Sequence, residues 1–309
     1  MSLNKPIYKL KDWIDIEKLN FKILLNNINL INFIKISKNK IYWNNNIILF
    51  ESLSVNDWSY LSRNSNAIEI LEDNQDKINW YLLCSNPNGI HILEKNLDKI
   101  CWCILSSNPN AISLLKENLD KINWSYLSMN PNALELLEKN QDKINWHLLC
   151  CNPNAISLLE NNLDKIDWYI LSANPNAIRI IENNLDKIDW CYLSLNPNAL
   201  EILKKNQDKI NWYYLSSNPN AISLLNENLD KINWYILSGN PNAIELLEKN
   251  QDKLNWSILS KNPSIFKLDY EKMKENNQEL YEELIKEVMK PSRVFKNPNY
   301  DYLEELFGD

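Results

Sequence analysis

The sequence predicts an all-α protein, a right-handed-type α-solenoid of short helix-turn-helix repeats. Tryptophan recurs every 22 residues, each repeat contains two helix-start signals, and the apolar residues between them have helical rather than alternating spacing. The ten regularly spaced tryptophans are Trp58, Trp80, Trp102, Trp124, Trp146, Trp168, Trp190, Trp212, Trp234 and Trp256.

The first helix of each repeat is expected to begin at the tryptophan. Asn or Asp precedes it in nine of the ten regular repeats, with Cys101 as the exception, and such side chains are typical N-caps. A second helix opens at Asn152-Pro153 and its equivalents, because proline at the first helical position loses only an N–H that had no partner. We expect this helix to end near Asn162, because asparagine tolerates the left-handed conformation that closes helices.

Neither helix is long enough to be stable alone, so stability must come from stacking. Adjacent columns of Asp and Lys, which start at Asp76 and Lys77, are positioned to pair between stacked repeats. The expected core columns, numbered in one repeat, are Trp146, Leu149, Ala155, Ile156, Leu159 and Ile166.

A leucine-rich-repeat-like α/β solenoid is the alternative fold. Its repeat length includes 22, and Ile166, Trp168 and Ile170 alternate as in a strand. However, the leucine-rich pattern requires a leucine where this chain has residues such as Tyr81 and His147. The caps before tryptophan also have no role in a strand, so the helical solenoid is favoured.

The repeats divide the chain into three regions. Residues 1–57 are expected to form an N-terminal leader with two degenerate capping repeats, marked by Phe21 and Trp43. Residues 58–266 form the regular array, and residues 267–309 a C-terminal capping helix, over 270–289, and a tail. Only 15 residues separate Trp43 from Trp58, which suggests that one early repeat has lost seven. Because helices pack about 8–10 Å apart, we expect an open array extending roughly 90–120 Å.

The repeat motif Trp-x-x-Leu-Ser-x-Asn-Pro-Asn-Ala-Ile resembles that of repeat proteins encoded by giant DNA viruses of protists and algae (mimivirus- and phycodnavirus-like). The resemblance extends to the opening Tyr8-Lys-Leu-Lys-Asp-Trp13 and to Asn262-Pro-Ser-Ile-Phe266, followed by Pro291-Ser-Arg293, and covers nearly the whole chain. Residues 20–57 and Ser65, in place of proline, depart from it. The resemblance implies a viral origin and a repeat fold, but no activity.

Composition excludes several function classes. The net charge of −7 argues against nucleic-acid and membrane-surface binding, and no run of 18 apolar residues could span a bilayer. The chain has no phosphate loop or nucleophile motif, so we expect no enzyme activity and no cofactor. The six cysteines are expected to be reduced thiols on a tolerant surface. We expect no metal site, because the spacing of the one metal-like cluster matches no usual zinc pattern. That cluster is Cys84, His91, Cys101 and Cys103.

Positions that vary among the repeats indicate a candidate binding surface. The residue after each tryptophan varies, and so does the residue four positions later, which lies on the same helix face. Tyrosine and serine suit adaptable recognition. We call this set the variable row, and its members are Tyr81, Ser85, Cys103, Ser125, Met129, His147, Tyr169, Cys191, Tyr213, Tyr235 and Ser257.

These observations predict a non-enzymatic, monomeric scaffold that binds a host or viral protein along the variable row. The expected location is the host cytoplasm. A structural component of the virion, and hence a location in the virus particle, is the alternative.

Overall fold

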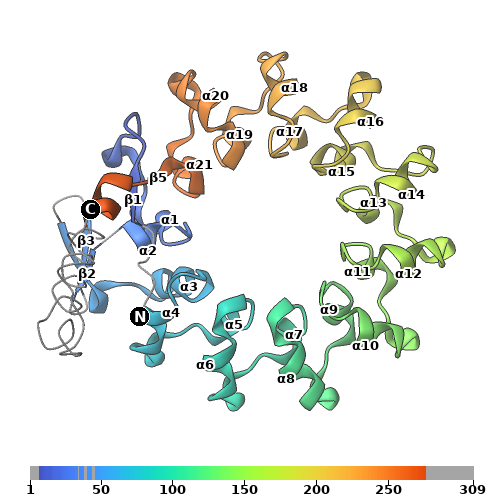
Figure 1. Ribbon diagram of the computed structural model, residues 1–309, viewed down its shortest axis with the longest axis horizontal. Helices are drawn as coiled ribbons and strands as arrows, with labels where there is room; N and C mark the ends of the chain where they lie inside the picture. Colours follow the sequence, from blue (N-terminus) through green and yellow to red (C-terminus); the bar gives the residue numbers. More distant parts are fainter. Residues whose placement is uncertain (1–6, 34, 38–39, 44–45, 276–309) are drawn as a thin grey trace, which may run out of the picture. The chain divides into compact units, whose positions relative to one another are not determined.

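The computed structural model describes residues 7–33, 35–37, 40–43 and 46–275. The chain divides into two compact units, one of residues 11–266 and the other of residues 1–10 with 267–309. Unit 11–266 is a helical solenoid in which short helices alternate between an inner and an outer row (Figure 1). Among the described residues, none of the helices combines the length and the apolar character needed to cross a membrane.

The inner row consists of the helices that begin at the periodic tryptophans, preceded by two helices of the early region (Figure 1). These are α1 (Phe21–Leu24), α3 (Val55–Arg63), α5 (Trp80–Leu83), α7 (Trp102–Leu105), α9 (Trp124–Ser128), α11 (Trp146–Leu149), α13 (Trp168–Leu171), α15 (Trp190–Leu195), α17 (Trp212–Leu215), α19 (Trp234–Leu237) and α21 (Trp256–Leu259).

The outer row follows the Asn-Pro-Asn segments, after α2 (Leu30–Phe33) in the early region. Its members are α4 (Ile68–Glu72), α6 (Ile90–Glu94), α8 (Ile112–Glu117), α10 (Leu134–Glu138), α12 (Ile156–Glu160), α14 (Ile178–Glu182), α16 (Leu200–Lys205), α18 (Ile222–Asn226) and α20 (Ile244–Glu248). Short 3₁₀ turns link most outer helices to the next inner helix, as in η9 (Leu163–Lys165).

Eight of the nine predicted caps of the inner helices are confirmed; the exception is Asp57, which lies inside α3, whose N-cap is Ser54. The Asn145 side chain accepts the N–H of Leu148 at 3.0 Å, and Asp167 accepts that of Ile170 at 3.2 Å. Cys101 makes no such bond. The predicted left-handed closure of the outer helix is wrong, because Asn162 has φ −140°. Its side-chain amide instead donates to the carbonyl of Leu158 at 2.9 Å and closes the helix that way.

The apolar core lies between the two rows of helices. Leu149, Ala155, Leu159 and Ile166 are buried as predicted, and their equivalents are buried in nearly every repeat. Two predicted core columns are wrong. Ile156 is only half-buried, and the neighbouring Leu158 takes the buried place.

The other incorrect core column is tryptophan itself. Among the ten periodic tryptophans only Trp58 is buried, whereas the others, such as Trp146, are half-buried. Lysine covers the exposed face: the ammonium group of Lys165 lies 4.3 Å from the centre of the Trp146 ring. The same contact links seven consecutive pairs, from Lys121 on Trp102 to Lys253 on Trp234.

This contact also corrects the role predicted for the lysine column. Each of these lysines lies in the turn before the next inner helix and contacts the tryptophan ring that opens its own repeat, as a cation–π partner. Where the structure shows an ion pair between the two columns, it joins neighbours in the sequence: Lys77 with Asp76, and Lys99 with Asp98, both at 3.1 Å.

A ladder of buried asparagines connects the repeats. The side-chain amide of Asn152 donates to the carbonyls of Ser128 and Asn130 in the preceding repeat, at 3.1 and 2.9 Å. Its oxygen accepts the N–H of Asn154 at 3.0 Å. Each ladder residue therefore satisfies two carbonyls of one repeat and one amide of its own. In the described chain its members are Asn27, Asn64, Asn86, Asn108, Asn130, Asn152, Asn174, Asn196, Asn218, Asn240 and Asn262.

Two further columns reinforce the ladder. Asn154 and its equivalents donate to the proline carbonyl of the preceding repeat, here Pro131 at 2.9 Å. The buried serine of each inner helix, such as Ser128, donates to the carbonyl four residues earlier and accepts the N–H of the next N-cap, Asn145, at 3.0 Å. Cys84 and Cys150 occupy this serine column and are buried, which corrects the prediction that the cysteines lie on a tolerant surface.

The ladder closes on itself, so unit 11–266 is a ring rather than the open array that we expected. Asn27 donates to the carbonyls of Ser260 and Asn262, at 3.2 and 3.0 Å. The N–H of Asn20 donates to the Ser260 hydroxyl at 3.0 Å. Lys18 also lies 5.1 Å from the centre of the Trp256 ring. The contact between α21 and α1 therefore has the same chemistry as the contacts between consecutive repeats.

The early region differs from the two degenerate repeats that we predicted. Phe21 begins a true inner helix, but Trp43 lies in strand β3 (Lys40–Trp43). This strand pairs antiparallel with β2 (Lys35–Ser37) and with β4 (Asn46–Leu49). The 37 residues from Phe21 to Trp58 thus form one repeat with an inserted three-stranded sheet, not a repeat that lost seven residues.

The second unit contains the pairing of β1 (Tyr8–Leu10) with β5 (Phe266–Leu268). The N–H of Asp269 donates to the carbonyl of Ile7 at 2.8 Å, and Lys9 lies 3.4 Å from the Asp269 carboxylate. Residues 270–275 are helical, which is the start of the helix predicted over 270–289. The remainder of that prediction lies outside the described residues.

Candidate functional site

The structure places the whole variable row on inner helices or directly after them. Each member is at least partly exposed, and the tyrosines are the most prominent. The inner helices border the opening of the ring, while the outer helices form its rim (Figure 1). The exposed fractions are 56% for Tyr81, 48% for Tyr169, 51% for Tyr213 and 53% for Tyr235.

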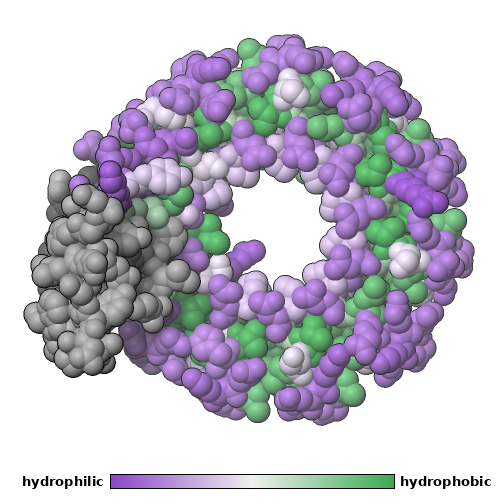
Figure 2. Space-filling model, in the orientation of Figure 1, coloured by the Kyte–Doolittle hydropathy of each residue, from purple (hydrophilic) through white to green (hydrophobic). Residues whose placement is uncertain are grey.

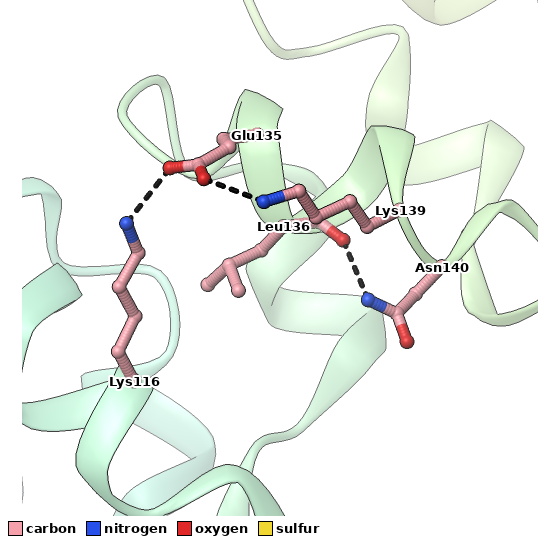
Figure 3. A network of polar contacts seen from close by, with 5 residues as sticks. All are labelled: Lys116, Glu135, Leu136, Lys139 and Asn140. Atoms are coloured by element: carbon pink, nitrogen blue, oxygen red, sulfur yellow. Dashed lines mark hydrogen bonds and ion pairs between the residues drawn. The ribbon is translucent and has the colours of Figure 1, made fainter.

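The inner row is also uncharged over most of its length. Helices α5, α7, α9, α11, α13, α15, α17, α19 and α21 contain no Lys, Arg, Asp or Glu. Figure 2 shows apolar side chains gathered between the opening and the rim, with hydrophilic residues both along the rim and around the opening. Charged groups on the outer helices form networks such as the one in Figure 3, where Glu135 on α10 binds Lys116 on α8 and Lys139, each at 2.8 Å.

Small residues of the variable row are engaged in contacts between repeats. The amide of Asn123, the next N-cap, donates to the sulfur of Cys103 at 3.6 Å. Asn145 donates in the same way to the Ser125 hydroxyl, and Asn211 to the sulfur of Cys191, at 3.4 and 3.2 Å. Part of the variation in the row is therefore explained by pairing with the following cap.

His147 also contacts the next N-cap, which in this case is the charged residue Asp167. Its Nδ1 lies 2.6 Å from the Asp167 carboxylate. Burial acts to raise the pKa of Asp167, but hydrogen bonds from His147 and backbone amides outweigh it and lower the pKa below its ordinary value. A cysteine beside a histidine–aspartate pair resembles a nucleophile site. Burial, however, raises the pKa of Cys150 to about 11 and also raises that of Cys151. Both thiols are therefore protonated at neutral pH and weakly nucleophilic.

Four tyrosines of the inner row form a contiguous cluster, which we call the tyrosine cluster: Tyr169, Tyr192, Tyr213 and Tyr214, on α13, α15 and α17. The ring centres of Tyr169 and Tyr192 are 3.9 Å apart, those of Tyr192 and Tyr214 6.1 Å, and those of Tyr213 and Tyr214 5.3 Å. A side-chain hydrogen bond with Tyr192 raises the pKa of Tyr169 to about 12, so this hydroxyl remains protonated over the physiological range.

Two cluster residues, Tyr192 and Tyr214, were missed in the sequence. They occupy the second position after tryptophan, which holds Ile or Leu in several repeats and therefore suggested packing. The signal was the run of aromatic residues in adjacent repeats, Trp-Tyr-Ile, Trp-Cys-Tyr and Trp-Tyr-Tyr. These stand at matching positions of helices that stack.

The residues of the metal-like cluster are held by other contacts. His91 on the outer helix α6 binds the Glu72 carboxylate at 2.7 Å. The N–H of Cys101 donates to the sulfur of Cys84 at 3.3 Å, and burial raises the pKa of Cys84. Within the described part of the chain, no three His, Cys, Asp or Glu side chains gather in a geometry able to hold a metal ion.

One cavity of about 340 Å³ lies beside Trp58, where the inserted segment rejoins the repeats, and is lined by residues that include Phe50, Val55 and Lys77. Trp58 is 3% exposed, with Phe50 packed edge-on at 5.7 Å between ring centres. Its indole nitrogen is buried and, among the described residues, has no hydrogen-bond partner. Because that nitrogen is not accessible from the cavity, it cannot recognise a ligand there.

The chain was compared with protein-family models, with curated proteins and with solved structures, and none of these matches it.

Proposed function

We propose that the protein is a non-enzymatic scaffold that binds a partner protein along the variable row, without a cofactor. We also propose that it acts as a monomer of giant-virus origin in the cytoplasm of the host, on the strength of the motif described above. The partner is a host or viral protein rather than a nucleic acid or a membrane.

The single observation that carries the proposal is the set of half-exposed tyrosines on inner helices that themselves contain no charged side chain. The centres of protein interfaces are depleted of charged residues and enriched in tyrosine and tryptophan. Tyrosine supplies a large, rigid contact area at low cost in conformational entropy. Tyr81, Tyr169, Tyr213 and Tyr235 are each about half exposed and repeat at equivalent positions, so they offer such contacts along the array.

Chemistry at the row supports binding over catalysis. His147 is paired with Asp167, and burial raises the pKa of the neighbouring thiols Cys150 and Cys151, which lie outside the row. A catalytic nucleophile requires the opposite shift. The net charge of −7 also disfavours a polyanionic partner, which is recognised through Lys and Arg.

An unbiased peptide-display selection against the purified protein tests this function. We expect enriched peptides that bind the wild type and bind Tyr169→Ser/Tyr213→Ser at least about tenfold more weakly, the loss typical of interface anchors. Tyr270→Ser is the matched control, because Tyr270 is an exposed tyrosine outside the row. Enriched peptides that ignore the double variant but lose affinity for the control would contradict the proposal, as would a selection that yields no binder.

A further inference from the structure

We infer that Cys84 and Cys101 are a site of reversible oxidation, at which a disulfide joins two consecutive repeats. The inference goes beyond the proposed function and does not depend on it. Cys84 directly follows the inner helix α5, and Cys101 directly precedes the next inner helix, α7 (Figure 1). The co-reactant is a small-molecule disulfide, with which the two thiols exchange.

The first argument is the contact between the two cysteines. The N–H of Cys101 donates to the sulfur of Cys84 at 3.3 Å. Because an N–Cα bond is about 1.46 Å long, this sulfur lies within about 4.8 Å of the Cys101 Cα atom. The two Cα atoms of a disulfide are usually about 4.4–6.8 Å apart. Rotation of the Cys101 side chain can therefore bring the two sulfurs together with only a small shift of the backbone.

The second argument is the place of the two cysteines in the repeat. Cys84 replaces the buried serine that accepts the N–H of the next cap in most repeats. Cys101 replaces the Asn or Asp cap itself. The other cysteine of the serine column, Cys150, is followed by an acidic cap, Asp167. Among the described repeats, the contact between this column and the next cap therefore joins two cysteines at one interface alone.

The third argument is that rotation of the Cys101 side chain sacrifices no capping bond. The caps of the neighbouring inner helices, Asn79 and Asn123, each accept an N–H of their own helix. Cys101 makes no such bond to α7. The substitution that removes a side-chain cap from α7 therefore supplies a thiol that can turn toward Cys84.

The difference in burial sets the order of the reaction. Cys84 is buried and Cys101 is half-buried, so a reagent from solvent reaches Cys101 first. Burial raises the pKa of Cys84 above its ordinary value and makes it the poorer first nucleophile. The Cys101 thiolate attacks one sulfur of a small-molecule disulfide, R–S–S–R, which forms a mixed disulfide and releases RS⁻.

Cys84 completes the exchange. It loses its proton, and its sulfur attacks the Cys101 sulfur, which forms the bond between the two repeats and releases a second RS⁻. Two protein thiols are thus oxidised, while one R–S–S–R is reduced to two R–SH, which take up the two protons.

The bond has a structural consequence for this part of the ring. It joins residues that are 17 apart in the sequence and encloses the outer helix α6 in a covalent loop. Such a loop restricts the unfolded chain and thereby stabilises the folded one. In reducing compartments disulfides are usually transient and serve catalysis or redox sensing, so a reversible response to oxidants suits this site better than a permanent cross-link.

Mass spectrometry of the full chain tests the inference. The protein is incubated with oxidised glutathione as the small-molecule disulfide, the remaining thiols are blocked, and the sample is digested with trypsin without reduction. Cleavage after lysine places Cys84 in peptide 78–95 and both Cys101 and Cys103 in peptide 100–116.

Four variants assign the bond. Cys84→Ser and Cys101→Asn restore the usual residues of their columns, and Cys103→Ser removes the other thiol of peptide 100–116. Cys150→Ser is the matched control, because Cys150 occupies the serine column without a cysteine cap. Thermal unfolding of each variant in its reduced form verifies that it folds.

We expect the wild type, Cys103→Ser and Cys150→Ser to form a cross-link between the two peptides, and Cys84→Ser and Cys101→Asn to form none. The oxidised wild type should unfold at a temperature higher by about 2 °C or more, and dithiothreitol should remove both the cross-link and this gain. Glutathione adducts without the cross-link would overturn the inference. So would a cross-link that persists in Cys101→Asn or that disappears in Cys103→Ser or Cys150→Ser.

Discussion

The contact that closes the ring and the contacts inside the array have the same chemistry but differ greatly in sequence separation. Asn27 reaches Asn262 across 235 residues, whereas Asn152 reaches Asn130 across 22. The amide–carbonyl distances, 3.0 and 2.9 Å, are nearly identical. The lysine–tryptophan contact is longer at the closure, 5.1 Å for Lys18 against 4.3 Å for Lys165.

The comparison separates the strength of a contact from the cost of making it. Closing a flexible loop costs about 0.6 kcal/mol more for each doubling of its length. The internal contacts close short loops, and each new repeat adds to a surface that is already formed. Closure instead requires the accumulated curvature of the whole array to be correct. We therefore expect the contact between α21 and α1 to form last and to open first.

The largest effect is expected for Asn152→Ala, inside the array. The substitution leaves the Ser128 carbonyl without a donor and the Asn154 N–H without an acceptor, at a cost of roughly 1–3 kcal/mol for each unsatisfied group, whereas the Asn130 carbonyl keeps the N–H of Ala133. The free energy of unfolding, from urea denaturation, should fall by roughly 2 kcal/mol or more. Asn161→Ala is the control, because Asn161 is exposed in the same repeat, and should change stability by less than about 0.5 kcal/mol. Similar losses for both variants would mean that the ladder contributes little.

Asn27→Ala removes the equivalent bonds at the closure and should have a smaller effect on global unfolding. Repeat arrays are stabilised by nearest-neighbour contacts, so the loss of one end contact leaves the other interfaces intact. Hydrogen exchange should accelerate at the N–H of Asn20, which bonds to Ser260, but not at the N–H of Asn145, which bonds to Ser128. Acceleration at both amides would show that closure and array unfold together.

The lysine–tryptophan contacts give a finer comparison. We expect Lys165→Met to lower the free energy of unfolding by about 0.5–1 kcal/mol, the range for exposed cation–π pairs. Lys18→Met should cost less, because its ammonium group lies farther from the Trp256 ring. Double-mutant cycles with Trp146→Phe and Trp256→Phe isolate the two pairwise energies. A larger coupling at the closure would reverse the ranking of the two interfaces.

The smallest effect concerns Glu135, whose ion pairs join two internal repeats. Hydrogen bonds from Lys116, and then from Lys139, lower its pKa from 4.5 to about 2. A lowered pKa stabilises the fold above the ordinary value, and this contribution disappears as the pH falls from 4.5 toward 2. At pH 6 the urea concentration at the midpoint of unfolding should therefore be slightly higher for the wild type than for Glu135→Gln. Near pH 2 the two midpoints should be equal. A gap that persists at pH 2 would exclude this titration as its origin.

Much of the repeat was predictable because local rules govern it. Caps and apolar spacing placed the inner helices correctly from Trp80 onward, whereas the outer α-helix begins at Ile156, three residues after the predicted start at Pro153. The half-burial of Trp146 was not predictable, because a large aromatic ring suggests a core and its lysine partner, Lys165, comes 19 residues later. The prediction of a repeat at Trp43 was wrong because the residues before Trp43 resemble those before the repeat tryptophans, although this segment pairs as a strand.

The closure of the ring could not be predicted from the sequence for a different reason. It depends on small rotations at every interface between repeats, which add up over the array and have no signature in the sequence of one repeat. Three residues carried a hint. Lys18, Asn20 and Asn27 stand at the same distances from Phe21 as Lys165, Asp167 and Asn174 do from Trp168. The variable row was placed on the surface correctly. The pairing of its small members with the next cap, as between Cys103 and Asn123, required the three-dimensional structure.

The closed ladder has a consequence for how such a gene can change. Tandem repeats gain and lose units by slippage during replication, and an open array tolerates this because either end can accept another unit. In a ring, the amide of Asn27 already occupies the carbonyls of Ser260 and Asn262, where a further unit would attach. A gained or lost unit must then be absorbed as extra bending at all the remaining interfaces. The ring therefore restricts the number of repeats, although the sequence of a single repeat shows no sign of this restriction.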